Sequence, residues 1–415
     1  MSSPATSADH GFAQATFLLV GAALLVVVGC RGANDPDRAP APADGPTWGA
    51  SIEPTIRVCC SPCHRSGGAA PFALSSADEV RRRSRKILSA LRSRTMPPWL
   101  PGPASAAFAG DRRLDEATIE RFAAWVEAGT PGGEPGARGT AESEATRAPG
   151  APRPLGDADL VLTVDRDLAL DASTDDRFVD VELPLPLERR AWIEAVDVDR
   201  GDPRRVEHAL VRLLRSDGTN GGVIAMAAAG RGPWIAPAGS AWPAAPGDRL
   251  ALRLFVVASP RATRVRPQMR LRLTDGPPAW TLRSLVVDVG AVTVPAREAA
   301  YRVEASIESR ETVDVVEVIP DAHLLCRGVR VTIDPPGAAA TTLLDIADWD
   351  LHWQEGYRLV EPLPLAPGTR IVGTWSFDNT RDNPRNPHVP LVPVSAGPRI
   401  DEARGSAWLV VRARR

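Results

Sequence analysis

The pentapeptide Cys60-Ser61-Pro62-Cys63-His64 constrains this chain more than any other feature of its sequence. Its two thiols are about one helical turn apart, and an imidazole follows the second thiol directly. Covalent haem attachment needs this combination, because the thiols add to the two haem vinyl groups and the imidazole reaches the iron. A C-x-x-C redox pair needs no following histidine, and a zinc site needs a second pair of ligands. The motif therefore predicts haem c, attached through Cys60 and Cys63, with His64 as one axial ligand.

The second axial ligand is expected on a loop C-terminal to this motif. Met96 is followed by Pro97 and Pro98, which stop the preceding helix and stiffen the loop. A thioether in this position can face the iron, and His/Met ligation raises the reduction potential relative to ligation by two histidines. The alternative is a methionine that fills the core. We predict that Met96 is the second axial ligand.

Short helices are predicted around the haem. Ser76 and Glu79 form the pattern of a capping box, which opens a helix extending to about Ser93. Residues 115–128 carry apolar side chains on one helical face, and Gly129 follows as a stop. Together with a helix that leads into the haem motif, these segments predict a small α-helical cytochrome c domain over residues 48–133.

The middle helix carries a basic run, Arg-Arg-Arg-Ser-Arg-Lys, at residues 81–86. One interpretation is an ordinary solvated helix face. The other is a docking patch for an acidic redox partner, or a set of charges that meets the haem propionates. The sequence alone leaves both interpretations open.

The N-terminus is predicted to be a targeting segment. Residues 16–29 are almost wholly apolar and end at Cys30. This run is too short to span a bilayer comfortably, but it fits the core of a signal peptide, and its Val-Val-Gly-Cys ending resembles a bacterial lipobox. Residues 1–30 are thus predicted to be a lipoprotein signal peptide with lipidation at Cys30, followed by a tether at 31–47. A plain secretory signal or an uncleaved short anchor is the alternative, since residues 1–15 contain no Lys or Arg.

These features predict an exported protein, periplasmic or on the cell surface, that is held to the membrane by a lipid anchor and exchanges electrons with an extracytoplasmic redox partner. The formal net charge of −2 gives no general attraction to nucleic acid, so we expect no nucleic-acid partner. The 415 residues suffice for several domains.

The remainder of the chain differs in composition and in its pattern of apolar residues. Residues 134–154 are nearly free of large apolar side chains and are predicted to be a linker. From residue 155 onward, short alternating strands recur between turn signals, and helical periodicity is scarce. We predict two tandem antiparallel β-sandwiches of the jelly-roll type, at residues 155–277 and 278–415.

A family resemblance becomes specific at this point. The chain resembles bacterial proteins that join a c-type cytochrome to a pair of copper type II, ascorbate-dependent (peptidylglycine hydroxylating) monooxygenase-like domains. The resemblance covers most of residues 48–415. It rests on CSPCHRSGGAAPF (60–72), RTMPPW (94–99), RRLDEATIERFAAWVEAGTPGG (112–133), Trp349-x-x-x-Trp353-Gln354-x-x-Tyr357, Leu365-x-Pro367-Gly368-Thr369, Phe377-Asp378-Asn379-Thr380 and Asn383-Pro384-Arg385-Asn386-Pro387.

The resemblance implies two copper sites, one with three His ligands and one with two His and a Met, but this chain lacks several of them. Glu207 stands beside His208 where a His-His pair is expected, and Asp321 precedes His323 where a His-x-His is expected. Ala403 follows Asp-Glu where a Met is expected. His208 and His323 are thus residual copper-site candidates, with ordinary hydrogen-bonded histidines as the alternative. We expect copper to be absent.

Two further histidines, His352 and His388, lie outside the matched positions, and we interpret them as structural or surface residues. The predicted function is extracytoplasmic electron transfer by haem c, with degenerate monooxygenase-like domains used for binding or scaffolding. One alternative is an active copper- or metal-dependent monooxygenase that receives electrons from the haem. Another is a surface adhesion or sensor module.

Overall fold

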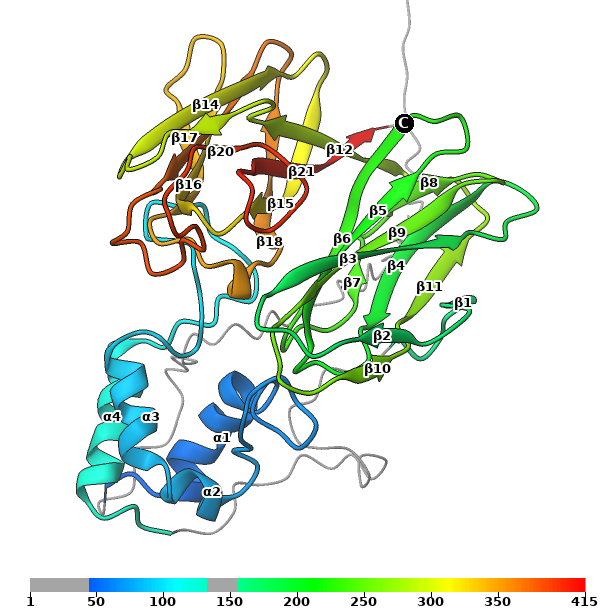
Figure 1. Ribbon diagram of the computed structural model, residues 1–415. Helices are drawn as coiled ribbons and strands as arrows, with labels where there is room; N and C mark the ends of the chain where they lie inside the picture. The colour runs from blue at the N-terminus through cyan, green and yellow to red at the C-terminus, as the bar shows by residue number, and fades with distance from the viewer. Residues whose placement is uncertain (1–44, 133–154, 415) are drawn as a thin grey trace, which may run out of the picture.

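The computed structural model describes residues 45–132 and 155–414. Residues 45–132 form a helical unit, and residues 155–414 form two β-sandwiches that lie next to each other (Figure 1). The predicted signal peptide with Cys30, most of the tether and the predicted linker 134–154 lie outside the described residues. In the part of the chain that is described, no helix has the length and apolarity needed to cross a bilayer.

The helical unit is held together by a small apolar core. Its helical segments are η1 (Trp48–Ile52), α1 (Glu53–Thr55), η2 (Ile56–Cys60), α2 (Ala77–Arg81), α3 (Ser84–Arg92) and α4 (Glu116–Glu127). Ile52 and Ile56 from the first segments, Leu91 from α3, and Phe122 and Trp125 from α4 are all buried in one cluster. This core packs the helices around the residues of the haem motif.

The predicted capping box is confirmed. The Glu79 N–H donates to Ser76 Oγ (3.3 Å), and the Ser76 N–H donates to Glu79 Oε2 (3.2 Å). The prediction of a single helix running to Ser93 is wrong, however, because the helix is interrupted between α2 and α3. The Arg83 N–H bonds to the Val80 carbonyl, a tighter i to i+3 turn that starts α3 with a new orientation.

The predicted helix at 115–128 is confirmed as α4. The Asp115 carboxylate caps its N-terminus by accepting from the Thr118 N–H (2.8 Å). Gly129, with φ of +80°, ends it in the left-handed conformation that only glycine adopts without strain.

The β part is built from alternating strands, as β14 illustrates with its regular succession of half-buried and exposed residues. The strands of the first sandwich are β1 (Leu160–Thr163), β2 (Leu168–Leu170), β3 (Arg177–Pro184), β4 (Ala191–Asp199), β5 (Val206–Leu214), β6 (Asn220–Ala228), β7 (Trp234–Ile235), β8 (Ser240–Ala244), β9 (Arg249–Val256), β10 (Thr263–Val265) and β11 (Gln268–Thr274). Those of the second are β12 (Trp280–Asp288), β13 (Thr293–Val294), β14 (Tyr301–Glu308), β15 (Val313–Ala322), β16 (Cys326–Asp334), β17 (Thr341–Ile346), β18 (Tyr357–Leu365), β19 (Arg370–Phe377), β20 (Val394–Ser395) and β21 (Gly405–Arg414), with the 3₁₀ turn η3 (Leu351–Trp353) between β17 and β18.

Each sandwich has one sheet of its own, in the order β3-β9-β5-β6 in the first and β14-β19-β16-β17 in the second. The other layer is shared. A single sheet runs β1-β11-β4-β8-β12-β21-β15-β18, with β7 attached to β4, and it passes from one sandwich to the other. The connection is a parallel pairing of β8 with β12, where Trp280 lies opposite Ser240 and Thr281 opposite Ala241. Tandem sandwiches predicted as separate units are therefore joined through their backbones.

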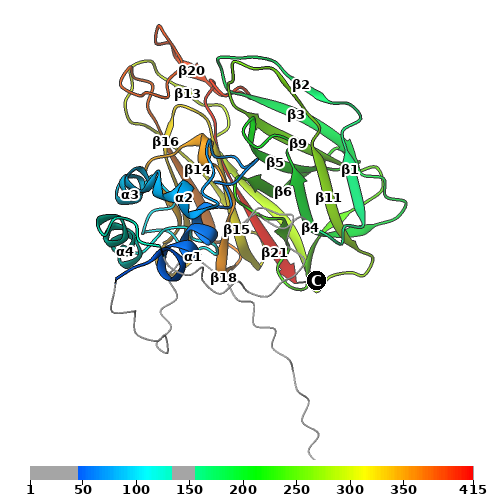
Figure 2. The same ribbon diagram turned by 90° about the horizontal axis from the view of Figure 1, so that it is seen from below.

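The helical unit is tied to the second sandwich by the segment between α3 and α4, residues 99–110, which we call the arm. The Gly102 N–H donates to the Asp345 carbonyl (2.7 Å), and the Ala109 N–H to the Arg358 carbonyl (2.8 Å). Phe108 forms an isolated bridge with Leu359 and is buried in the second sandwich's core. Figure 2, from the end that carries the helices, shows them in front of the second sandwich with the first sandwich to one side.

Candidate functional site

The four residues predicted to hold a haem line one cavity. Cys60, Cys63, His64 and Met96 all line a cavity of about 440 Å³ that is partly open to solvent, within the range of cofactor and ligand pockets. The other lining residues are mostly apolar and come chiefly from the helical unit. They are Cys59, Ala69, Ala70, Pro71, Phe72, Leu74, Lys86, Ile87, Ala90, Leu91, Thr95, Pro97, Pro98 and Arg112, with Glu207, Ala229, His352 and Trp353 from the sandwiches.

Local backbone geometry brings the two thiols to the same side. η2 ends at Cys60, and the next turn is closed by hydrogen bonds from the Cys63 N–H (3.2 Å) and the His64 N–H (2.9 Å) to the Cys60 carbonyl. The chain then folds back, so that the Leu74 N–H donates to the His64 carbonyl (2.9 Å). One helical turn thus presents both sulfurs and the imidazole to the cavity.

His64 has the hydrogen bond expected of an iron ligand. Its Nδ1–H donates to the Phe72 carbonyl (3.0 Å), which leaves Nε2 as the nitrogen with a lone pair for a metal. The imidazole lies 4.7 Å from the Phe72 ring, measured between ring centroids. Burial lowers the pKa of His64, so the neutral form that binds metals is favoured.

Met96 lies directly after α3 on the loop predicted for it. The N–H groups of Thr95 and Met96 both donate to the Ala90 carbonyl (3.1 and 3.3 Å), which turns the chain at the end of the helix. Pro97 is buried and also lines the cavity, and the arm that follows is fixed to the second sandwich. The loop therefore holds its thioether at the cavity from both ends. An imidazole, a thioether and two thiols on one apolar cavity fit the ligand set of haem c.

Cys63 is covered by the turn between β6 and β7. Burial raises the pKa of its thiol, which keeps the sulfur protonated. Gly230 in that turn has φ of +74°, and a Cβ there would lie 2.7 Å from Cys63 Sγ. Only glycine allows so close an approach, so the first sandwich packs directly on a predicted attachment sulfur.

Both sandwiches contribute polar residues to the cavity wall. His352 of η3 donates from Nδ1 to Glu207 Oε2 of β5 (2.8 Å), and its Nε2 lies 3.4 Å from Asp176. The hydrogen bond to Glu207 raises the pKa of His352. His352, interpreted from the sequence as a structural or surface residue, has a side chain that is 39% exposed and that also lines the cavity. The partners are 145 positions apart, so no local pattern could have found them.

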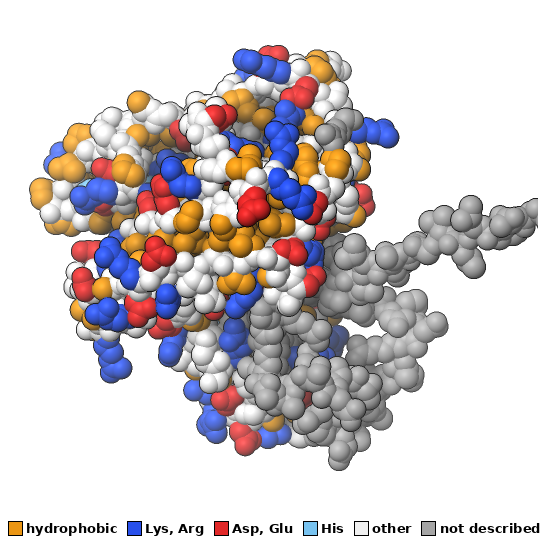
Figure 3. Space-filling view, turned by 90° about the vertical axis from the view of Figure 1, so that its right-hand side faces the viewer, with side chains coloured by type: hydrophobic (Ala, Val, Ile, Leu, Met, Phe, Trp, Pro, Cys, Tyr) orange, Lys and Arg blue, Asp and Glu red, His pale blue; other side chains and the backbone are white. Residues whose placement is uncertain are grey.

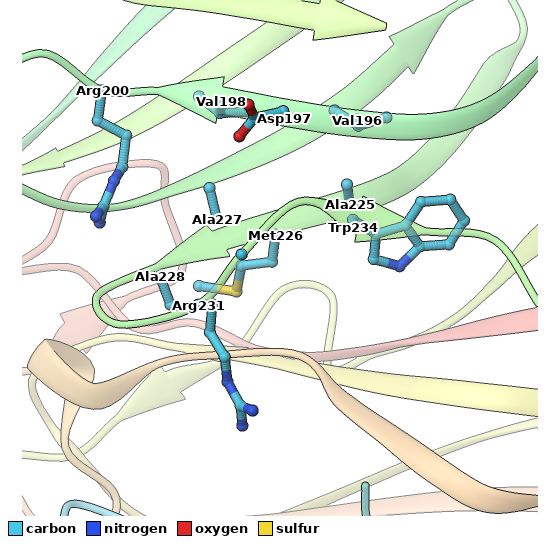
Figure 4. Close-up of a pocket in the computed structure, with 11 residues that line it drawn as sticks. Val196, Asp197, Val198, Arg200, Ala225, Met226, Ala227, Ala228, Arg231 and Trp234 are labelled. Atoms are coloured by element: carbon cyan, nitrogen blue, oxygen red, sulfur yellow. The ribbon is translucent and has the colours of Figure 1, made fainter. Parts of the chain in front are cut away.

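A buried ion-pair cluster lies beside this wall. Glu355 is 3% exposed and is contacted by the guanidinium groups of Arg112 from the helical unit and Arg231 from the β6–β7 turn, the latter at 2.7 Å. Figure 4 shows Arg231 pointing away from β4, toward the ribbon of the second sandwich; the labelled residues line a smaller cavity of about 40 Å³. The cluster therefore joins the helical unit and both sandwiches at one carboxylate.

His208 lies in the core between the sandwiches, on β5. It is 3% exposed, and its ring stacks on Phe255 with centroids 4.7 Å apart. Burial and the charge of Arg200 lower the pKa of His208 to about 3. Its Nδ1 has no hydrogen-bond partner among the described residues. His208 is thus a neutral imidazole packed as an aromatic ring.

His323 follows β15 and is also buried. Its Nδ1–H donates to the Glu402 carbonyl (3.2 Å), and its ring contacts Phe178 at 5.2 Å. Burial lowers its pKa to about 4. Burial is the largest influence on the neighbouring Asp321 and would raise its pKa, but the charges of Arg404, His323 and Arg253, with the hydrogen bond from Arg404 (2.8 Å), together lower that pKa to about 2. His323 thus faces an aromatic ring and a carboxylate that is already paired.

These surroundings do not fit the copper pair that the resemblance implies. Glu207 is engaged by His352 and Asp321 by Arg404, while Ala403 is buried and has no donor atom. Over residues 45–132 and 155–414, no three His, Cys, Asp or Glu side chains are grouped so as to hold a metal ion. His388, interpreted as structural or surface, donates from Nε2 to the Asp401 carbonyl (2.8 Å).

Comparison with known proteins identifies no family. No family model matches the chain, and no curated protein matches it. Among solved structures it is similar to the major capsid protein P2 of bacteriophage PM2, at 9% identity and a TM-score of 0.22 over 54% of this chain and 99% of that one. It is also similar to the triple jelly-roll protein of an archaeal virus, at 6% identity and a TM-score of 0.18 over 60% of each chain. Likenesses this low carry no argument about activity.

Proposed function

We propose that this protein is an extracytoplasmic electron-transfer protein that carries one haem c in the cavity between its helical unit and its sandwiches. The observation that carries the proposal is that Cys60, Cys63, His64 and Met96 line one cavity of about 440 Å³. A motif match alone would give three of these residues. Met96 lies 32 positions after His64, and its presence in the same cavity is independent support.

The chain's own residues have definite tasks in this proposal. Each thiol would add across one vinyl group of the haem, with the sulfur bonding to one vinyl carbon and the thiol hydrogen passing to the other. His64 Nε2 and Met96 Sδ would hold the iron, and the Phe72 carbonyl orients the imidazole. Apolar side chains such as Ile87 and Leu91 exclude water from the cavity. Bound haem supplies a reversible one-electron change at iron.

The sandwiches serve, in this proposal, as a scaffold that completes the haem cavity rather than as a copper enzyme. Glu207 and His352 form part of the cavity wall, and Gly230 covers Cys63. The two acidic residues at expected copper-ligand positions are bound to other side chains: Glu207 to His352 and Asp321 to Arg404. We propose export and lipid anchoring at Cys30 as well, on the sequence pattern alone.

The test is production of the full chain in a bacterium with a periplasmic haem c maturation system. Covalent haem should be visible on a denaturing gel, and Cys60→Ala with Cys63→Ala should abolish it. Metal analysis should give about one iron per chain and no stoichiometric copper. Absence of covalent haem from the wild type would overturn the proposal. Two coppers per chain with ascorbate-driven substrate oxidation would favour a monooxygenase fed by the haem. Iron without any electron exchange would favour the adhesion or sensor function.

A further inference from the structure

Part of the basic run at residues 81–86 lies at the candidate haem cavity without an acidic partner, whereas Arg81 is paired with Asp78. Residues 80–110 contain seven Lys and Arg side chains and no Asp or Glu, in a chain whose formal net charge is −2. Arg82, Arg85 and Lys86 are exposed, and Arg83 is partly so. None of these four forms an ion pair with another described residue. We call these four residues the basic face.

The basic face adjoins the candidate haem site directly. The Arg83 guanidinium lies 4.9 Å and the Lys86 ammonium 5.8 Å from the centre of the Phe72 ring. Phe72 and Lys86 both line the cavity, and the Phe72 ring lies 4.7 Å from that of His64. A protein docked on this face would therefore lie within one side-chain layer of the predicted axial ligand.

The sandwiches cover another part of the cavity wall, so a redox partner can come closest to the cavity over the basic face. Residues of both sandwiches close another part of the cavity wall, where Gly230 covers Cys63 and Trp353 lines the cavity. The surface on the first sandwich's side carries charged side chains of both signs, interspersed with hydrophobic ones (Figure 3). Such a mixed surface gives little directional attraction, whereas a cluster of one sign steers a partner of opposite charge.

We infer that the basic face is the docking surface for an acidic one-electron redox protein, an inference that rests on the proposed haem function. Docking exchanges one electron between the partner's redox centre and the haem site. No covalent bond changes and no proton moves in this step. The four cations supply long-range attraction and orient the partner over Phe72.

The experiment measures electron transfer from reduced plastocyanin, an acidic one-electron protein, to the oxidised full-length protein by stopped flow. The test variant combines Arg82→Glu, Arg85→Glu and Lys86→Glu. The control combines Arg166→Glu, Arg261→Glu and Arg310→Glu, three exposed arginines on the sandwiches that give the same change in net charge. A second variant, Arg82→Lys with Arg85→Lys, keeps the charge. Haem content and absorption spectrum are recorded for each.

At about 10 mM ionic strength, the test variant should lose tenfold or more of the bimolecular rate, and the difference should shrink toward nothing at about 0.5 M salt. The control and the lysine variant should stay within about twofold of the wild type. Equal losses in test variant and control would overturn the inference, because they would reflect net charge alone. So would an effect confined to reduction by ferrocyanide, a small anion, or salt-sensitive binding to anionic phospholipid vesicles with an unchanged plastocyanin rate. In these outcomes covalent haem is retained; its absence from the wild type would instead refute the proposed function.

Discussion

The haem-motif cavity and the junction around His208 and His323 both contain histidines, but only at the cavity do further donor side chains face the same open space. At the cavity, His64 turns Nδ1 to a carbonyl and keeps Nε2 for a ligand, next to a thioether and two thiols. At the junction, His208 stacks on Phe255, and the nearby carboxylate Asp321 is paired with Arg404. The comparison teaches that an unpaired histidine nitrogen does not by itself make a metal site, since His208 Nδ1 and His323 Nε2 also lack a hydrogen-bond partner among the described residues, yet their rings pack against Phe255 and Phe178.

The largest expected effect concerns the cavity. Met96→Leu removes the thioether, and Met96→His replaces it with an imidazole. Met96→His should lower the reduction potential of the haem and abolish the weak absorption band characteristic of iron–thioether ligation, since thioether ligation raises the potential. Spectroscopy and potentiometry measure both. Met226→Leu, in the first sandwich, is the control and should change neither. An unaltered spectrum in Met96→His would show that another residue is the ligand.

The next effect tests whether the cavity depends on all three parts of the molecule. Glu355→Ala leaves the guanidinium groups of Arg112 and Arg231 without their shared buried carboxylate. Breaking a buried ion pair from one side costs about 3–5 kcal/mol, so the free energy of unfolding should fall by this amount in urea titrations. Glu361→Ala, at an exposed position on β18, should cost little. Similar losses in both variants would contradict the role assigned to Glu355.

Acidification probes the junction. An unfolded histidine has a pKa near 6.5, whereas burial holds His208 at about 3 and His323 at about 4. Between these values the unfolded chain binds protons that the folded chain does not, so stability falls as the pH drops below 6.5. At pH 5 each histidine should cost about 2 kcal/mol. Asp321, with a pKa of about 2, keeps its contribution at this pH, because its protonation begins only below about 4.

Urea titrations at pH 7 and pH 5 measure this loss. His208→Gln and His323→Gln should each reduce the difference between the two pH values, because glutamine has no proton to gain. A copper-loaded junction would behave differently, since metal binding makes the loss of stability depend on added copper. An equal acid dependence in the wild type and both variants would contradict the assignment of neutral, buried histidines.

The smallest effect concerns the contact between the first sandwich and Cys63. Gly230→Ala strains a residue with φ of +74° and places a methyl group 2.7 Å from Cys63 Sγ. Gly218→Ala is the matched control, with φ of +81° and nothing within 4 Å of its Cβ. Both should lose about 1 kcal/mol from backbone strain. Only Gly230→Ala should lose more, by about 1–2 kcal/mol, and only it should perturb the haem spectrum. Equal behaviour of the two would mean that the turn does not press on Cys63.

Sequence reasoning succeeded where the physical cause is local. The capping box is a contact between Ser76 and Glu79, which are only three positions apart. The helix α4 was predictable from its own apolar face and from Gly129, which follows it. Strands with regular alternation were likewise visible, so the predominantly β character of residues 155–414 was predictable. Proximity of Met96 to the cavity followed from the two prolines that force a loop.

The parts that sequence reasoning missed depend on contacts between distant segments. Glu207 and His352 meet only because β5 and η3 lie at the same junction. The arm at residues 99–110 belongs by sequence to the helical unit, yet Phe108 is buried in the second sandwich. The shared sheet likewise arises from a parallel pairing of β8 and β12 that strand patterns do not specify.

The covering of Cys63 by Gly230 has a consequence for the order of assembly. Under the proposed function, haem has to reach Cys63 before the β6–β7 turn covers that sulfur, and residues 228–230 and 352–353 follow the motif by more than 150 positions. On a chain that crosses a membrane from its N-terminus, the thiols emerge long before their cover does. Under the proposed function, haem attachment therefore precedes the docking of the first sandwich, which covers the Cys63 sulfur afterwards.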